Sequence, residues 1–113
     1  MDQKIAERWV AALRSGEYKQ GKFVLRNGDH LCCLGVLCDL YSHDHPEVIE
    51  KDFFKGTFLN RSFTLPDEVA DWAGMESTNG TLWTQEKCLS YLNDTGASFD
   101  SLASLIETYR EEL

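Results

Sequence analysis

The sequence has no long hydrophobic run, and its beginning lacks the pattern of an export signal. A membrane-spanning helix needs about 20 consecutive apolar residues, and no stretch of this chain approaches that length. The first four residues, Met1-Asp2-Gln3-Lys4, do not show the basic-then-apolar order of a secretory signal. We therefore expect a soluble, cytoplasmic protein with no membrane partner.

Basic residues are scarce after position 30. Residues 31–113 hold five Lys and Arg against fifteen Asp and Glu, whereas residues 1–30 hold six against four. The acidic part disfavours nucleic acid as a general partner and favours a basic protein surface. The first thirty residues would still present a local cationic patch, made of Arg14, Lys19, Lys22, Arg26 and His30. Solubility alone also explains charged faces of this kind.

The sequence also lacks the spacings between cysteines and histidines that are typical of metal sites, although four cysteines and three histidines are present. Neither a Cys-x₂-Cys nor a His-x₃-His pair occurs. We therefore expect no metal and no other cofactor. Because no secretory signal accompanies them, we interpret the cysteines as reduced thiols, with Cys33 and Cys38 packed in the core as small apolar side chains.

No proline- or glycine-rich linker divides the chain, and a hydrophobic content of 42% favours a folded core. We expect one domain over residues 1–113. Its predicted centre is the stretch 30–41, which is apolar nearly all round apart from Asp39. A helix of this kind must be covered by other elements, and we expect it to end within residues 42–45. Gly35 costs about 1 kcal/mol of helix propensity relative to Ala, so we expect it to admit a neighbouring backbone.

Periodicity and capping residues predict the other elements. Three more helices are expected, over 2–15 with Asp2 as N-cap, over 66–73 ended by Gly74, and from Ser98 onward. A hairpin is expected from strands 23–26 and 29–32 joined at Asn27-Gly28. The less regular segments are interpreted as a polar connection over 17–21, a short helix over 46–49, a second hairpin of 58–59 with 63–64, a strand at 82–83, and a helix or a strand over 85–92. The predicted fold class is α+β, with a central buried helix wrapped by two to three helices and one or two β-hairpins.

Four stretches of the sequence resemble a widespread family of small phage and prophage proteins, mostly without assigned functions. They are residues 9–16 (WVAALRSG), 32–40 (CCLGVLCDL), 65–74 (LPDEVADWAG) and 92–99 (LNDTGASF). The resemblance implies a phage origin and no particular catalytic residues. It implies a soluble accessory protein that inhibits or sequesters a host defence component, and the acidic composition suits a basic protein partner.

Two alternatives stay open beside this binding function. In the first, the protein is a sponge for a nucleotide immune signal, with Arg14, Lys22 and Arg26 on the phosphates. In the second, it is an enzyme built on Cys32 or Cys33, whose thiol pKa a helix start would lower. One of His30, His43 and His45 would then serve as the base. No hydrolase signature accompanies these residues, so a non-enzymatic function is the main expectation.

The residues expected to contact a ligand or partner form three sets. The first is cationic: Arg14, Lys22, Arg26 and His30. The second is aromatic, from segments of weak periodicity: Phe53, Phe54 and Trp83. The third is the turn pair Asn93 and Asp94, which either binds a ligand or caps the following helix. The sequence leaves a homo-oligomer open.

Overall fold

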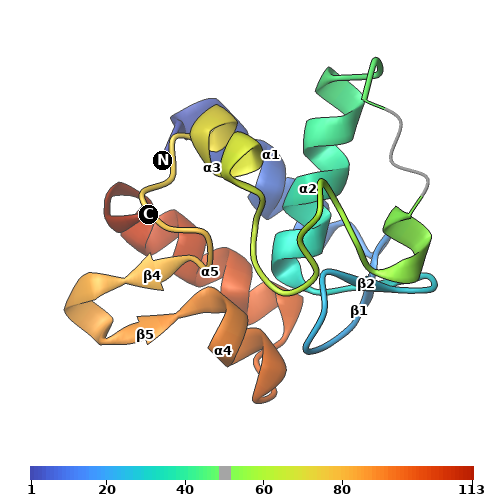
Figure 1. The fold of residues 1–113 in the computed structure, drawn as a ribbon. Coiled ribbons are helices and arrows are strands. Elements are labelled where there is room, and N and C mark those ends of the chain that lie inside the picture. Colours follow the sequence, from blue (N-terminus) through green and yellow to red (C-terminus); the bar gives the residue numbers. More distant parts are fainter. Residues whose placement is uncertain (49–51) are drawn as a thin grey trace.

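The computed structural model describes residues 1–48 and 52–113, and within them five α-helices and two small sheets surround one hydrophobic cluster (Figure 1). The helices are α1 (Gln3–Arg14), α2 (Cys33–Asp44), α3 (Asp67–Ala73), α4 (Leu89–Asp94) and α5 (Phe99–Tyr109). The strands are β1 (Lys19–Gln20), β2 (Arg26–Asn27), β3 (His30–Leu31), β4 (Thr81–Leu82) and β5 (Lys87–Cys88). The 3₁₀ turns are η1 (Phe53–Lys55), η2 (Trp83–Gln85) and η3 (Arg110–Glu112). The predicted α+β class is confirmed.

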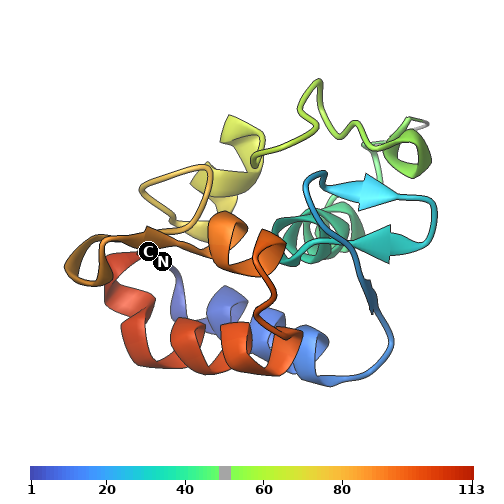
Figure 2. The same cartoon turned by 90° about the horizontal axis from the view of Figure 1, so that it is seen from below.

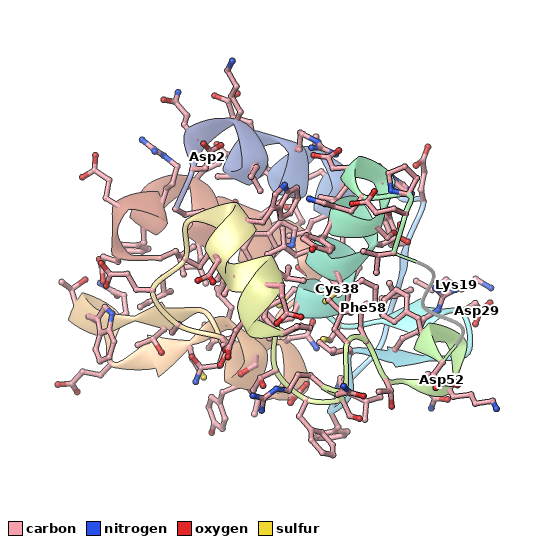
Figure 3. All side chains as sticks on the ribbon, turned by 45° about the horizontal axis from the view of Figure 1, so that its top comes forward. Asp2, Lys19, Asp29, Cys38, Asp52 and Phe58 are labelled. Carbon is pink, nitrogen blue, oxygen red and sulfur yellow. The ribbon has the colours of Figure 1, made fainter. Side chains whose placement is uncertain are left out.

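Helix α2 is the centre of the core, as its composition predicted. Its buried residues occupy every side of the helix, and α1, α3 and α4 pack against it. Figure 3 places Cys38 of this helix and Phe58 in the interior. A Cβ atom on Gly35 would overlap the carbonyl oxygen of Leu25 and lie 2.9 Å from its carbonyl carbon. Gly35 therefore admits a neighbouring backbone, which confirms the expectation.

Helices α1 and α5 lie side by side along one face of the core (Figure 2). Asp2 caps α1 by accepting a hydrogen bond from Ile5 N at 2.9 Å, and Ser98 caps α5 by accepting one from Ser101 N at 3.1 Å. Both predicted N-caps are confirmed. The indole of Trp9 donates to Cys33 O at 2.9 Å, which ties α1 to the start of α2.

The three-stranded sheet differs from the predicted hairpin in its details. β3 pairs antiparallel with β2, with Asn27 opposite His30, so the turn residues are Gly28 and Asp29 and not Asn27 and Gly28. The predicted strand over 23–26 is wrong before Arg26, because Phe23 takes a left-handed φ of 73°. The connection over 17–21 contains β1, which pairs parallel with β3.

The remaining irregular segments also show where local pattern was insufficient. The second predicted hairpin is wrong, because a single bridge joins Phe58 to Arg61 across two residues with positive φ, Leu59 and Asn60. The ambiguous segment 85–92 divides into β5 and the start of α4. Of the helix predicted over 46–49, residues 46 and 47 form a turn and residue 49 lies outside the described residues. In the part of the chain that the structure describes, no helix combines the length and apolar character needed to cross a membrane.

Candidate functional site

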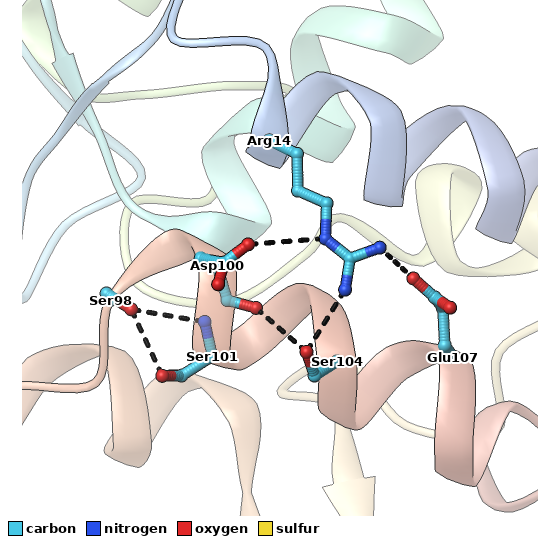
Figure 4. Close-up of polar contacts among 6 residues, drawn as sticks. All are labelled: Arg14, Ser98, Asp100, Ser101, Ser104 and Glu107. Carbon is cyan, nitrogen blue, oxygen red and sulfur yellow. Dashed lines mark hydrogen bonds and ion pairs between the residues drawn. The ribbon is translucent and has the colours of Figure 1, made fainter.

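Arg14 does not join the other predicted cations, because it pairs with α5. Its Nε lies 3.4 Å from Asp100 Oδ1, its Nη1 contacts Glu107 Oε1, and its Nη2 donates to Ser104 Oγ at 3.0 Å (Figure 4). Two carboxylates and a hydroxyl therefore already surround the guanidinium. This arrangement ties two helices together and leaves little positive charge for a phosphate.

Arg26 and Phe53 contact each other. Arg26 Nε donates to Gly28 O at 2.7 Å, and its guanidinium carbon lies 5.0 Å from the centre of the Phe53 ring. The Phe53 side chain is only 6% exposed and meets the Phe58 ring edge to face at 4.8 Å. Phe53 is therefore wrong as a partner-facing residue, because it belongs to the core. The side chain of Phe54, also predicted to face a partner, lies outside the described part of the structure.

His30 lies in a charge cluster that carboxylates offset. Asp29 lies between Lys19 and His30, 3.0 Å from Lys19 Nζ and 2.9 Å from His30 Nδ1, at the periphery of the molecule (Figure 3). The hydrogen bond from Lys19 holds the pKa of Asp29 below its usual value. The Tyr18 hydroxyl donates to Asp39 at 2.6 Å in an adjacent hollow of about 230 Å³. The predicted cationic patch is therefore interrupted by acidic side chains.

The cysteines of α2 do not have the environment of a nucleophile. Burial raises the pKa of Cys32 to about 11 and also raises the pKa of Cys33 and Cys38. The thiolate is the reactive form of cysteine, so this burial outweighs any effect of the helix start. His43 lies ten residues beyond Cys33, about 15 Å along the helix axis. Geometry and protonation therefore both oppose the cysteine-centred alternative.

Asn93 and Asp94 hold the loop that follows β1. The fully buried Asn93 accepts hydrogen bonds at Oδ1 from Gln20 Nε2 (2.9 Å) and Cys33 N (3.2 Å), and donates from Nδ2 to Gly21 O (2.9 Å). Asp94 Oδ1 accepts a hydrogen bond from Phe23 N at 2.8 Å. The expected cap on the following helix is wrong, because Ser98 caps α5, whereas Asn93 accepts a hydrogen bond from Cys33 N at the start of α2. Asn93 therefore serves the scaffold, and a direct contact between this buried side chain and a ligand is not supported.

The consequence of these contacts is the placement of Phe23, a residue that the sequence did not mark. Its side chain is 67% exposed although its backbone is held in a left-handed conformation. Lys22, one of the predicted cations, is exposed beside it. The apolar run 23–25 predicts a strand. The loop forms instead because Phe23 N donates a hydrogen bond to Asp94, a contact with a residue distant in sequence that the local pattern does not indicate.

Trp83 is the predicted aromatic residue that the structure places at the surface, with 62% of its side chain exposed. It begins the turn η2 between β4 and β5. The next residue, Thr84, donates from its backbone N to Glu112 at 2.8 Å, which ties this hairpin to η3. Glu76 N donates to Leu113 O at 2.6 Å and ties the preceding loop to the same place. We define the acidic hairpin face as Trp83 with Glu76, Glu86, Glu111 and Glu112.

The acidic hairpin face belongs to the part of the chain that carries the whole net charge. Residues 67–113 contain ten Asp and Glu against two Lys and Arg, a balance of −8, which equals the net charge of the entire sequence. Figure 1 shows the hairpin, α5 and α3 on one side of the molecule, away from the three-stranded sheet. Helix α3 adds three exposed carboxylates, Asp67, Glu68 and Asp71. Carboxylates therefore outnumber cations in this part of the chain, and its hairpin carries one large exposed aromatic residue.

Two other hollows are shallow and mixed in character. A groove of about 510 Å³ between α1 and α5 has Ala6, Val10 and Ala11 among its lining residues and Arg14 at its edge. A second, of about 390 Å³, lies beside β5 and includes Cys88. Within residues 1–48 and 52–113, no buried polar side chain lacks a partner and no three His, Cys, Asp or Glu gather as metal ligands.

Comparison with known proteins gives a family. The model of a domain of unknown function, DUF8296, matches residues 1–110 and so spans every helix described above. No curated protein and no solved structure matches the chain. The match covers nearly the whole sequence, and the chain belongs to the DUF8296 family.

Proposed function

We propose that this chain is a non-enzymatic binding protein whose acidic hairpin face docks on a basic surface of a partner protein. The observation that carries the proposal is the position of Trp83. The tryptophan is 62% exposed, and its hairpin together with the segments tied to that hairpin carries four carboxylates against two cations, Lys87 and Arg110. A ring that is so exposed buries little apolar area and so adds little to the stability of the fold.

The chemistry of the acidic hairpin face fits a protein partner. Tryptophan is among the residues that contribute most to binding energy when a partner encloses it. Carboxylates around such an anchor attract a basic surface over distance and suppress encounters with acidic ones. The two ties to η3 and to Leu113 fix the hairpin before a partner arrives, so little ordering entropy would be lost on binding.

The biological setting follows from the resemblance to phage and prophage proteins. As a phage-encoded accessory protein in the bacterial cytoplasm, the chain would inhibit or sequester a basic host defence component. The separation of Arg14 and Arg26 gives less support to the nucleotide sponge, since each already has a polar or aromatic partner. The raised pKa values of the α2 cysteines give less support to the enzyme.

The test is a capture from host lysate, followed by binding measurements with the identified and purified partner. Trp83→Ala is expected to weaken that binding by about 30-fold or more, the effect of a hot-spot residue. The double variant Glu86→Gln, Glu111→Gln is expected to slow association and reduce its dependence on salt. Phe63→Ala, which removes an equally exposed ring away from the face, is the matched control.

Two results would contradict the proposal. One is a captured partner that binds Trp83→Ala as tightly as the original protein. The other is an affinity that does not fall as salt rises, because charge complementarity would then contribute nothing.

A further inference from the structure

Three exposed rings lie on segments that contact each other, and one of them, Tyr91, lines the hollow beside β5 together with Glu86. We propose that this aromatic loop face, made of Phe23, Phe63 and Tyr91 with Lys22 and Arg61, is a stacking platform for single-stranded nucleic acid. Phe23 and Phe63 are each 67% exposed and Tyr91 is 61% exposed. The inference goes beyond the protein-binding function proposed above and uses none of its residues.

Two hydrogen bonds bring the three segments together. Leu25 N donates to Ser62 O at 2.7 Å, so the loop with Lys22 and Phe23 runs beside the segment with Arg61 and Phe63. On the other side, Phe23 N donates to Asp94 Oδ1, and Tyr91 lies one helical turn before Asp94 in α4. Figures 1 and 2 both show the loop after β1 passing beside α4.

The backbone under these rings is strained and held in place. Phe23 has a φ of 73°, and the turn before Phe63 contains two more non-glycine residues with positive φ, Leu59 at 47° and Asn60 at 69°. Such conformations cost about 1–3 kcal/mol each and persist where surrounding contacts impose them, often at binding sites. The contact from Asp94, supported by the buried Asn93, imposes the one at Phe23. An exposed phenylalanine gains nothing from this strain in the folded chain alone.

The side chains of the aromatic loop face match the chemistry of a nucleic-acid strand. Bases stack on exposed aromatic rings regardless of sequence, and cations beside the rings meet the phosphates. In the part of the chain described here, neither Lys22 nor Arg61 has a side-chain ion pair or hydrogen bond. The nearby carboxylate of Asp94 is engaged with Phe23 N. Residues 1–66 carry nine basic and nine acidic residues, so the charge of −8 belongs to the rest of the chain.

A strand fits this face better than a free nucleotide or a protein. Tyr91 lines the hollow beside β5, but neither Phe23 nor Phe63 lines any of the three hollows described above. A single base would therefore meet only one side of the Phe23 or Phe63 ring. A strand gains from each ring that it reaches. A protein partner would need a larger complementary area than a few separated rings provide.

The experiment is fluorescence anisotropy with a labelled single-stranded oligodeoxyadenylate of about 12 nucleotides, within the range of known site sizes. The strand is expected to bind, and the same sequence in duplex form is expected to bind at least tenfold more weakly, because its bases are covered. Phe63→Ala is expected to weaken binding about 5- to 150-fold, the effect of one lost stack. With two phosphates contacted, log K should fall against log salt with a slope of about −1.4, and Lys22→Ala should reduce the slope to about −0.7.

Phe23→Gly separates binding from folding. Glycine accepts a positive φ without strain, so this variant is expected to unfold at a higher temperature and yet to lose strand binding. Trp83→Ala, which removes an exposed ring elsewhere, is the control and should bind the strand unchanged. A structural role alone for Phe23 predicts the opposite, a less stable variant with no change in strand binding.

The proposal is overturned if the strand does not bind at low salt, or if Phe23→Gly and Phe63→Ala bind it like the original protein. It is also overturned if adenosine monophosphate binds as tightly as the strand, because the ligand would then be a free nucleotide. Neither outcome bears on the acidic hairpin face, since Trp83 and its carboxylates lie outside these variants.

Discussion

At the scale of single residues, Asn93 links three segments that are distant in sequence. Its side chain reaches Gln20, Gly21 and the first amide of α2. Asn93→Ala would leave Cys33 N buried without a partner and would remove the partner of the part-buried Gly21 O. A buried unsatisfied group costs about 1–3 kcal/mol, so we expect the free energy of unfolding to fall by at least about 1–3 kcal/mol, measured by urea denaturation.

The control for Asn93 is Asn27→Ala, because Asn27 is an exposed asparagine at the end of strand β2. This change should alter stability by no more than about 0.5 kcal/mol, as surface substitutions usually do. If both variants lost the same small amount, the network around Asn93 would have no special part in the fold.

Gly35 offers a test in which two effects have opposite signs. Helix propensity alone predicts that Gly35→Ala stabilises α2 by about 1 kcal/mol. The overlap of the new Cβ with the Leu25 carbonyl predicts destabilisation, of the order of 1–3 kcal/mol for an overpacked core. We expect the second effect to prevail in a thermal unfolding measurement. Ala11→Gly, at an exposed position of α1, calibrates the propensity difference in this protein.

At the scale of elements, burial should keep the thiols of Cys32, just before α2, and of Cys33 and Cys38, within it, from reacting. Cys32, Cys33 and Cys38 are buried, and Cys88, the second residue of β5, is half-buried. We expect one thiol of the native protein to react readily with a disulfide reagent near neutral pH and all four to react after denaturation. Cys88→Ala should abolish the fast reaction. A fast reaction that survived in this variant would show that α2 opens more readily than its packing indicates.

The elements differ in how far the sequence alone could place them. Helices α1, α2, α3 and α5 were predictable from their apolar residues, and polar caps such as Asp2 and Ser98 mark the starts of α1 and α5. Helix α4 was not, because residues 85–92 fit a helix or a strand equally well. The strands are only two residues long, too short for an alternating pattern to appear. β1 in particular depends on a parallel pairing with β3 that no local signal marks.

The candidate surfaces were predictable only in part, because they too depend on contacts between segments distant in sequence. Trp83 was recognisable as an aromatic outside any periodic pattern, and it is exposed. Phe53 had the same signature and is buried, because the cover for its ring comes from the Phe58 ring and the Arg26 guanidinium. Exposure of an aromatic side chain in an irregular segment is decided by tertiary contacts, and a single sequence does not display them.

At the scale of the whole molecule, the raised thiol pKa values predict alkaline destabilisation. The folded chain holds the Cys32 proton up to a pKa of about 11, whereas an unfolded thiol releases it near 9.0. The stabilisation is therefore complete below the unfolded pKa and is lost as pH rises from there. By about pH 10, Cys32 alone should reduce the free energy of unfolding by about 1.4 kcal/mol. Urea denaturation at about pH 8 and about pH 10 measures the loss.

Burial also raises the pKa of Cys33, Cys38 and Tyr18, so the total alkaline loss should exceed that of Cys32. The difference between the two pH values should be smaller in Cys32→Ala than in the original protein. An equal difference in both would mean that this thiol is accessible to solvent in the folded state.

The end of α3 and the loop after it hold the two ends of the sequence close together. Ala73 O accepts a hydrogen bond from Asp2 N, and three residues later Glu76 N donates to Leu113 O. Positions 1 and 113 are therefore neighbours, as Figures 1 and 2 show. A short glycine-serine bridge between them, with new ends opened between Gly28 and Asp29, should give a circular permutant with the same helical circular dichroism. Such a permutant would carry a purification tag on the far side of the molecule from Trp83 and leave the hairpin unobstructed.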